Sequence, residues 1–239
     1  MKKVLLLAVF AGFLSMGISA QTADKKVSET SYMLAKRGQE DAFQKAVMAH
    51  NAKFHPANTG NSALLRKVVY GEKAGWFVWI HGPVTYADLD IVKGQAHDDD
   101  WSNTVDPLIE EYGPIDLWEY DDALSYGKEK MATAKYYDAW VIDIKRGEGY
   151  RFDEMMKKLS AAVKEDGKHS NLVWWNVVRR DSKADVSILW TFDNFAEWDS
   201  DTLKDAYEKV NGEDSWRLFW EEWEEVVVDY TEEIREMIR

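Results

Sequence analysis

Two stretches of the chain share a hydrophobic pattern with the period of an amphipathic helix. In each stretch, large side chains follow one another at positions i, i+4, i+7 and i+11, so they line one helix face. The first stretch carries Phe43, Val47, His50 and Phe54, and the second carries Phe152, Met156, Leu159 and Val163. Pro56 and Gly167 are expected to end these helices.

Short runs rich in β-branched and aromatic residues surround each helix and predict β-strands. They cover residues 32–36, 64–70, 76–81 and 115–120 in the first half, and 140–145, 172–179, 186–192 and 226–230 in the second. A second helical region precedes the last strand of each half and is expected to end at Tyr112 or Trp223. Each half therefore has the predicted order βαββαβ, and the fold class is α+β.

The two halves also match in sequence, at a spacing of about 109 residues. Lys36-Arg37-Gly38 recurs as Lys145-Arg146-Gly147, and Tyr86-Ala87-Asp88-Leu89-Asp90 falls on Phe195-Ala196-Glu197-Trp198-Asp199 once one residue is inserted. We interpret this match as an internal duplication. Repeat 1 is predicted to span residues 28–120 and repeat 2 residues 135–235, with a linker at residues 121–134 between them.

A βαββαβ unit of this length is a ferredoxin-like split βαβ. Two such units in tandem, with the phrase Tyr86-Ala87-Asp88-Leu89-Asp90 after the third strand, resemble the dimeric α+β barrel superfamily. This superfamily includes antibiotic-biosynthesis monooxygenase-like, stress-responsive A/B barrel and NIPSNAP-like proteins. The resemblance implies an intramolecular barrel and a pocket between the sheet and the helices of each repeat. It implies no single function, because related folds include oxygenases, haem-degrading enzymes, lyases and proteins without chemistry.

The first residues have the features of a secretory signal peptide. Lys2 and Lys3 precede an apolar run of about 15 residues that ends at Ser19 and Ala20. This run is shorter than the roughly 20 residues that cross a bilayer. We expect residues 1–20 to be removed and the protein to be exported, to the periplasm or the medium, without stable membrane insertion afterwards.

Charge and composition exclude several kinds of partner and site. The formal net charge is -13, which argues against nucleic acid as a partner. The chain has no cysteine, so it forms no disulfide and has no thiolate nucleophile or thiolate metal ligand. The sequence motifs of zinc proteases, serine hydrolases, phosphate-binding loops and EF-hands are also absent. A small molecule is the expected partner.

His50 is the main candidate for chemistry, because the duplicated position in repeat 2 is Leu159. A buried imidazole needs a partner or a pocket, since an unpaired buried polar group costs about 1–3 kcal/mol. His81 ends the third strand, on the same face as Phe77 and Trp79, and a helix packed over that face would bring it to His50. We expect His50 and His81 to be catalytic as acid and base, and Trp76, Trp79, Phe43 and Phe54 to bind the ligand. The alternative is that His50 is a core or helix-end histidine with a structural role.

No metal or other cofactor is required by the sequence, and His81 is one candidate ligand if a haem or a metal ion is bound. His97 is the other candidate. It precedes Asp98, Asp99 and Asp100 at the predicted start of the second helix, where acidic residues are favoured by capping and by the helix dipole. The resemblance adds haem as an alternative cofactor, because some haem-handling members of the superfamily ligate iron with a histidine on that helix. His55 is expected at the surface or as a helix cap, and His169 in a solvated loop.

The sequence thus indicates an exported α+β barrel protein that binds a small, largely apolar ligand in a pocket of repeat 1. A cofactor-free monooxygenase-like or lyase-like activity is compatible with that pocket. A haem or metal binder and a non-catalytic interaction or stress protein are the alternatives. Because repeat 2 supplies the partner that single-copy relatives gain by dimerising, we expect a monomer with pseudo-two-fold symmetry.

Overall fold

The structure, a computed structural model, describes residues 26–57, 59–178, 184–200 and 202–239. The predicted signal peptide, residues 1–20, lies outside these residues. The first half contains β1 (Val27–Ala35), α1 (Glu40–Phe54), β2 (Ala63–Tyr70), β3 (Phe77–Val84), α2 (Tyr86–Leu89), α3 (Gln95–Thr104), the 3-10 segment η1 (Asp106–Leu108) and β4 (Ile109–Tyr120).

The second half follows the same order of strands and helices. It contains η2 (Lys128–Ala132), β5 (Tyr136–Ile144), α4 (Gly149–Asp166), β6 (Asn171–Asn176), β7 (Val186–Phe192), η3 (Phe195–Ser200), α5 (Leu203–Asn211), α6 (Ser215–Val226) and β8 (Val227–Ile238). None of the helices among the described residues combines the length and the apolar character needed to cross a bilayer.

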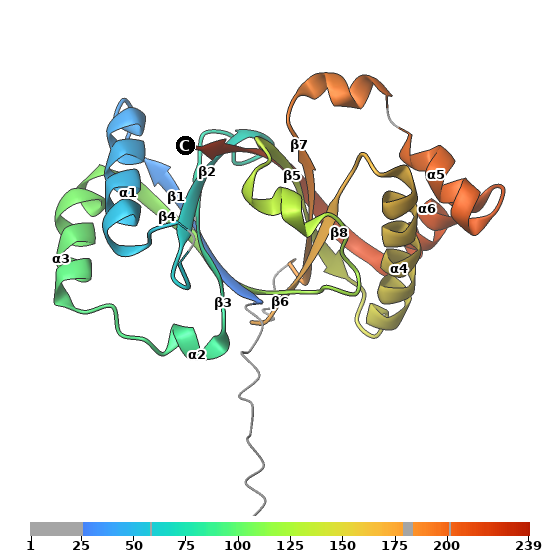
Figure 1. The fold of residues 1–239 in the computed structure, drawn as a ribbon, viewed down its shortest axis with the longest axis horizontal. Helices are drawn as coiled ribbons and strands as arrows, with labels where there is room; N and C mark the ends of the chain where they lie inside the picture. Colours follow the sequence, from blue (N-terminus) through green and yellow to red (C-terminus); the bar gives the residue numbers. More distant parts are fainter. Residues whose placement is uncertain (1–25, 58, 179–183, 201) are drawn as a thin grey trace, which may run out of the picture.

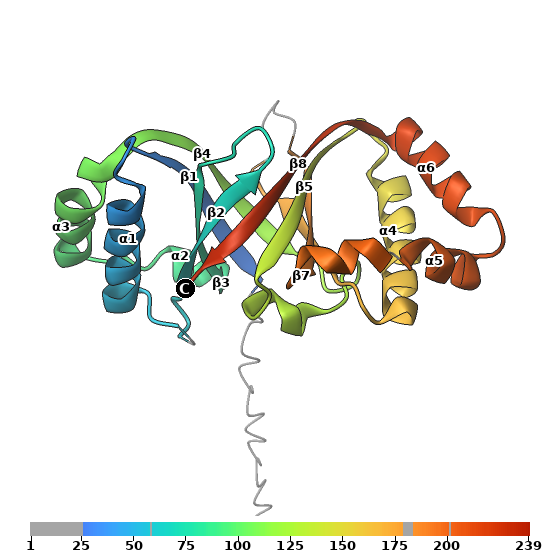
Figure 2. The same cartoon turned by 90° about the horizontal axis from the view of Figure 1, so that it is seen from above.

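The eight strands of the described residues form one antiparallel sheet that closes as a barrel, in the order β1-β3-β2-β8-β5-β7-β6-β4. Two ladders join the halves: β2 pairs with β8, and β4 pairs with β6. Helices α1 and α3 cover one side of the barrel, and α4, α5 and α6 cover the opposite side (Figure 1). The view from above shows β8 lying between β2 and β5 (Figure 2). The α+β class and the antiparallel sheet are confirmed.

The predicted helix stripes point at the sheet in both halves. Phe43, Val47 and His50 of α1 are buried, as are Phe152, Met156, Leu159 and Val163 of α4. Strand alternation also holds in β3, where Phe77 and Trp79 pack with the α1 side chains and His81 stacks on Trp79, with ring centroids 5.8 Å apart. These contacts orient α1 so that its last turn faces the end of β3.

Several predicted boundaries are wrong: in the second half, β5 begins at Tyr136 rather than Trp140, and β8 runs to Ile238 rather than Tyr230. Two further differences lie in the first half. The second helical region of the first half ends at Thr104 rather than Tyr112, and Tyr112 lies within β4, paired with Met33 of β1. The first strand of the same half begins at Val27, well before the predicted Tyr32. In both places hydrogen bonds to β1 or β4 extend a strand through glutamates, serines or a Gly-Pro pair that local propensity alone disfavours.

Candidate metal centre

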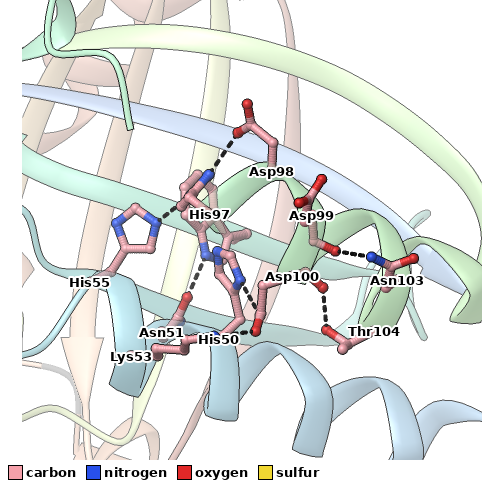
Figure 3. Close-up of polar contacts among 11 residues, drawn as sticks. His50, Asn51, Lys53, His55, His97, Asp98, Asp99, Asp100, Asn103 and Thr104 are labelled. Carbon is pink, nitrogen blue, oxygen red and sulfur yellow. Dashed lines mark hydrogen bonds and ion pairs between the residues drawn. The ribbon is translucent and has the colours of Figure 1, made fainter. Parts of the chain in front are cut away.

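Three histidines meet on the outer face of the barrel, beneath α1 and α3 (Figure 3). His50 lies on α1, His55 is the residue that caps the C-terminus of α1, and His97 lies in the first turn of α3. One ring nitrogen from each histidine lies within 4.8 Å of the other two. The side chains of His50 and His55 are almost fully buried, and His97 is partly exposed.

Local sequence explains why these side chains converge. His50 belongs to the apolar stripe of α1, so burial of that stripe turns it toward the sheet. The helix ends at Phe54 because Pro56 has no N–H to continue it, and the His55 N–H bonds back to the Asn51 carbonyl at 2.7 Å. The chain then folds back and leaves His55 facing inward.

The Nδ1 atom of each histidine donates a hydrogen bond away from the centre of the cluster. His55 Nδ1 lies 3.1 Å from the Asn61 carbonyl oxygen, which can only accept. His97 Nδ1 lies 2.9 Å from Asp98 Oδ1, and His50 Nδ1 lies 2.9 Å from Asp100 Oδ2. A proton on each Nδ1 leaves each Nε2 with a lone pair. Metal-binding histidines are oriented in this way, with one nitrogen held by a carboxylate or carbonyl and the other free for the metal.

When both rings are neutral and protonated on Nδ1, the Nε2 lone pairs of His55 and His97 face one another, whereas a second proton on either ring would make this contact a hydrogen bond. His55 Nε2 and His97 Nε2 are 3.1 Å apart, and both of these histidines already carry their proton on Nδ1. His50 Nε2 is buried and has no hydrogen-bond partner among the described residues. Nitrogens bound to one tetrahedral zinc ion at 2.0–2.1 Å lie roughly 3.3 Å from each other. The His55–His97 pair already has this spacing.

Burial favours the neutral form of His50 and of His55. It lowers the pKa of His55 to about 4 and the pKa of His50 below its usual value, even though the carboxylate of Asp100 acts on His50 in the opposite direction. Hydrogen bonds from Lys53 and then from His50 hold the pKa of Asp100 low, so Asp100 remains an acceptor. Neutral imidazole is the form that binds a metal ion.

Polar neighbours fix the histidines in place. Asn61 accepts from His55 through its backbone, and its side-chain oxygen accepts from His81 Nε2 at 2.8 Å and from the Lys93 ammonium. Burial lowers the pKa of His81 to about 4. On the other side of the cluster, Trp79 Nε1 donates to Asn51 Oδ1 at 2.9 Å. These contacts connect β3, the end of α1 and the segment before α3.

A pocket of about 270 Å³ opens beside the cluster. Its wall includes Phe54, Asn61, Lys93 and His97, together with the apolar side chains of Ile91 and Val92. The ring of Phe54 also packs on His50, with centroids 4.9 Å apart. A small molecule in this pocket would therefore reach His97 and contact both an ammonium group and apolar side chains.

The structure brings together some of the residues predicted for the site and separates others. His50, Trp79, His81 and Phe54 lie in or beside the cluster, and His81 meets His55 rather than His50, at a ring distance of 5.3 Å. Phe43 is a core residue packed on Phe77. Trp76 lies outside the site, because strand alternation turns it to the other face of the sheet, against Tyr32, Val68 and Val78.

The largest correction concerns His55. The sequence predicts it at the surface or as a cap, and although it occupies the cap position its side chain is 1 % exposed and takes part in the cluster. Asp100 and Trp101 are also site residues that the sequence interpretation misses. They lie three and four positions after His97, so they share its helix face, and this spacing was a readable signal.

No protein-family model matches the chain, and no curated protein matches it either. Solved structures do resemble it. A proposed monooxygenase from Lactobacillus acidophilus is 12% identical, with 90% of this chain and 99% of that chain covered and a TM-score of 0.57. A proposed monooxygenase from Fusobacterium nucleatum is 11% identical, covers 89% of this chain and 92% of its own, and has a TM-score of 0.59.

A third similar structure is a mutant chlorite dismutase from Candidatus Nitrospira defluvii in complex with cyanide. It is 8% identical, with 90% of this chain and 92% of that chain covered and a TM-score of 0.55. Similarity at this identity is evidence about the fold alone. The chain therefore shares an α+β fold with these structures.

Proposed function

We propose that this protein binds a divalent transition-metal ion through His50, His55 and His97 and uses it on a small molecule held in the adjoining pocket. One observation carries the proposal: the Nε2 atoms of His55 and His97 lie 3.1 Å apart, while the Nδ1 atom of each ring faces an oxygen acceptor. Two neutral rings held in this way direct their lone pairs at each other, and a proton or a metal ion between the two nitrogens removes the repulsion. The unpaired Nε2 of His50 supplies a third donor.

The donor set indicates the class of metal. Three imidazoles without a thiolate suit zinc, copper, iron or nickel, whereas calcium and magnesium prefer oxygen ligands. Three protein ligands also leave a coordination position for water or substrate, as in catalytic zinc sites. The pocket at Phe54, Lys93 and His97 gives such a molecule access. The structurally similar proteins described as monooxygenases and chlorite dismutase make oxidation chemistry one activity to assay.

The proposal is tested by metal titration of the purified protein. After dialysis against a chelator, Zn²⁺, Cu²⁺, Ni²⁺ and Co²⁺ are titrated by calorimetry, and the visible spectrum of the Co²⁺ form reports its geometry. We expect one tight site per chain, with affinity at least about 100-fold lower in His55→Ala and in His97→Ala, which corresponds to about 2.7 kcal/mol.

His169→Ala is the matched control, because His169 also bonds an aspartate through Nδ1 but lies in the second half. It should bind metal as the wild type does, and circular dichroism checks that every variant is folded. Equal metal affinity of the wild type and a folded His55→Ala/His97→Ala double variant would overturn the proposal. A Soret band in the purified protein would instead favour haem.

Acid–base chemistry without a metal is a second candidate. The His50–Asp100 pair resembles the dyads in which a carboxylate orients an imidazole and leaves its other nitrogen as the base. This candidate keeps the predicted role of His50, with His81 acting through Asn61 and His55 rather than by direct contact. Turnover that survives exhaustive chelation but is lost in Asp100→Asn would favour it over the metal.

We further infer that the barrel arose by fusion of two ferredoxin-like units and that the chain is an exported monomer. The sequence match between the halves and the same element order in both support the fusion, and the two ladders between the halves complete the barrel without a second chain. A stable dimer in light scattering would contradict the monomer. Cytoplasmic retention of the full-length chain would contradict the export.

A further inference from the structure

A second, larger hollow lies inside the barrel, away from the histidines. Its volume is about 740 Å³, and residues from all eight strands line it. Much of the wall is apolar, with Leu64, Ile80, Trp118, Val141, Leu189 and Met237. Cavities of this size and character suit a small organic molecule.

Arg66 of β2 brings a positive charge into this hollow. The residue lines the cavity and is only 2 % exposed. Its Nε and Nη1 atoms have no hydrogen-bond partner among the described residues. Its guanidinium lies 3.3 Å from the ring centroid of Tyr137, and this cation–π contact and a side-chain hydrogen bond with Tyr137 both favour the charge, but Nε and Nη1 remain without an acceptor. A buried guanidinium in this state is strongly under-satisfied.

Arg235, on the neighbouring strand β8, makes the contrast clear. Its Nε donates to Glu233 Oε1 at 2.6 Å, and its Nη2 donates to the Tyr32 hydroxyl at 2.7 Å. The Tyr32 hydroxyl donates in turn to the same Glu233 oxygen at 2.5 Å. The same barrel therefore holds one arginine with a built-in carboxylate partner and one arginine without it.

Trp174 of β6, on the opposite side of the barrel from β2, adds a second unpaired donor to the cavity. Its side chain lines the cavity, and its buried Nε1 has no acceptor among the described residues. Trp118, which also lines the cavity, instead donates its Nε1 to Thr30 Oγ1 at 3.0 Å. Two donors without acceptors around one apolar hollow indicate a ligand that brings acceptors of its own.

Arg66 keeps its charge at neutral pH. Burial lowers its pKa to about 10, with the neighbouring charge of Arg235 acting in the same direction, and this value is still well above 7. Acidic side chains reach the cavity wall too, but Glu233 is held by Arg235, and no described carboxylate forms an ion pair with Arg66. The missing partner is therefore an anion.

We propose that the barrel cavity binds a small organic acid with an apolar body, whose carboxylate pairs with Arg66 and whose body lies against the apolar wall. The planar guanidinium can hold a carboxylate through two parallel hydrogen bonds. This site is separate from the histidine cluster, and it requires no metal.

Decanoate, with decanol as the uncharged molecule of the same chain length, is the probe. Calorimetric titration of the full chain should show decanoate binding at least about tenfold tighter than decanol, the factor that corresponds to about 1.4 kcal/mol. In Arg66→Met the affinity for decanoate should fall to that for decanol, while the affinity for decanol stays the same. Arg217→Met is the matched control, because this arginine is half exposed on α6 and paired with Asp214.

A folding defect in Arg66→Met would not prevent the test. The melting temperature of the wild type should rise more with decanoate than with an equal concentration of decanol, and this comparison needs no variant. Equal effects of the two probes on the wild type, or equal decanoate affinity of the wild type and a folded Arg66→Met, would overturn the proposal.

Discussion

The two helix-covered sides of the barrel have the same architecture and opposite chemistry. In the second half, α4 packs Leu159 into a continuous apolar core with Phe152, Met156 and the tryptophans of α6. In the first half, α1 places His50 at the same point of its stripe, and the smaller core there ends in a group of imidazoles. We infer from this difference that the packed core of the second half stabilises the fold, whereas in the first half the histidine cluster takes the place of part of the apolar core.

Replacing each of the two stripe residues, one at a time, tests this division of roles and has the largest expected effect on stability. Leu159→Ala should lower the free energy of unfolding by about 3 kcal/mol, because it leaves a cavity in a packed core. His50→Leu should change the free energy of unfolding of the metal-free protein by less than about 1 kcal/mol, because the loss of the Nδ1 hydrogen bond to Asp100 is offset by the removal of a buried Nε2 without a partner. Urea unfolding in the presence of a chelator measures both. A loss in His50→Leu as large as that in Leu159→Ala would make His50 a structural core histidine.

The second half also contains a buried titratable residue, Asp138, whose protonation should change the stability of the protein. Asp138 of β5 is 8 % exposed, and burial, followed by the nearby Glu232, raises its pKa to about 7. Between its unfolded pKa, about 4, and about 7 the folded state binds more protons than the unfolded state, so this group makes stability fall as pH rises. Asp138→Asn should therefore raise the free energy of unfolding by about 2 kcal/mol at pH 8 and by much less at pH 4.

The matched control is Asp199→Asn, an exposed aspartate of the same half. Its effect on stability should be small at both pH values. Equal effects of Asp138→Asn at pH 4 and pH 8 would show that the carboxyl is not the group whose titration changes stability.

Tryptophan fluorescence gives the smallest expected effect. Trp79 and Trp101 flank the cluster, with ring centroids 5.4 Å from His55 and 4.9 Å from His50, but the chain has 12 tryptophans in all. Bound Cu²⁺ should quench a minor part of the emission. That part should disappear in the Trp79→Phe/Trp101→Phe variant and persist in Trp220→Phe, which alters the second half. If the quenching is lost in Trp220→Phe instead, the ion binds near α6 in the second half and not at the histidine cluster.

The fold was largely predictable because its signals are local. The helix stripes of α1 and α4 and the alternation in β3 depend on residues a few positions apart, and the structure has them as predicted. The start of β4 was not predictable in this way. Ile109 to Pro114 contains glutamates, Gly113 and a proline, and this segment is a strand because β1 pairs with it.

The site was only partly predictable, because it depends on contacts between distant segments. His50 was found because the residue that aligns with it in the second half, Leu159, is apolar, and this comparison needs only the sequence. His55 could not be found in this way, since its role depends on the Asn61 carbonyl and on His97, 42 positions later. Trp76 was predicted for the same site as Trp79, but the alternation that groups Trp79 with His81 turns Trp76 to the opposite face of the sheet.

The position of β8 has a consequence for how copies of this chain behave toward one another. As the last strand, it closes the ring by pairing with β2 of the first half and β5 of its own half. Within the described sheet no strand therefore offers an open edge on which a second molecule could build. If β8 detached, two edges would open at once. The simplest way to cover both would be to accept β8 from another copy, so loosening this one strand would turn a self-contained barrel into a domain-swapped assembly.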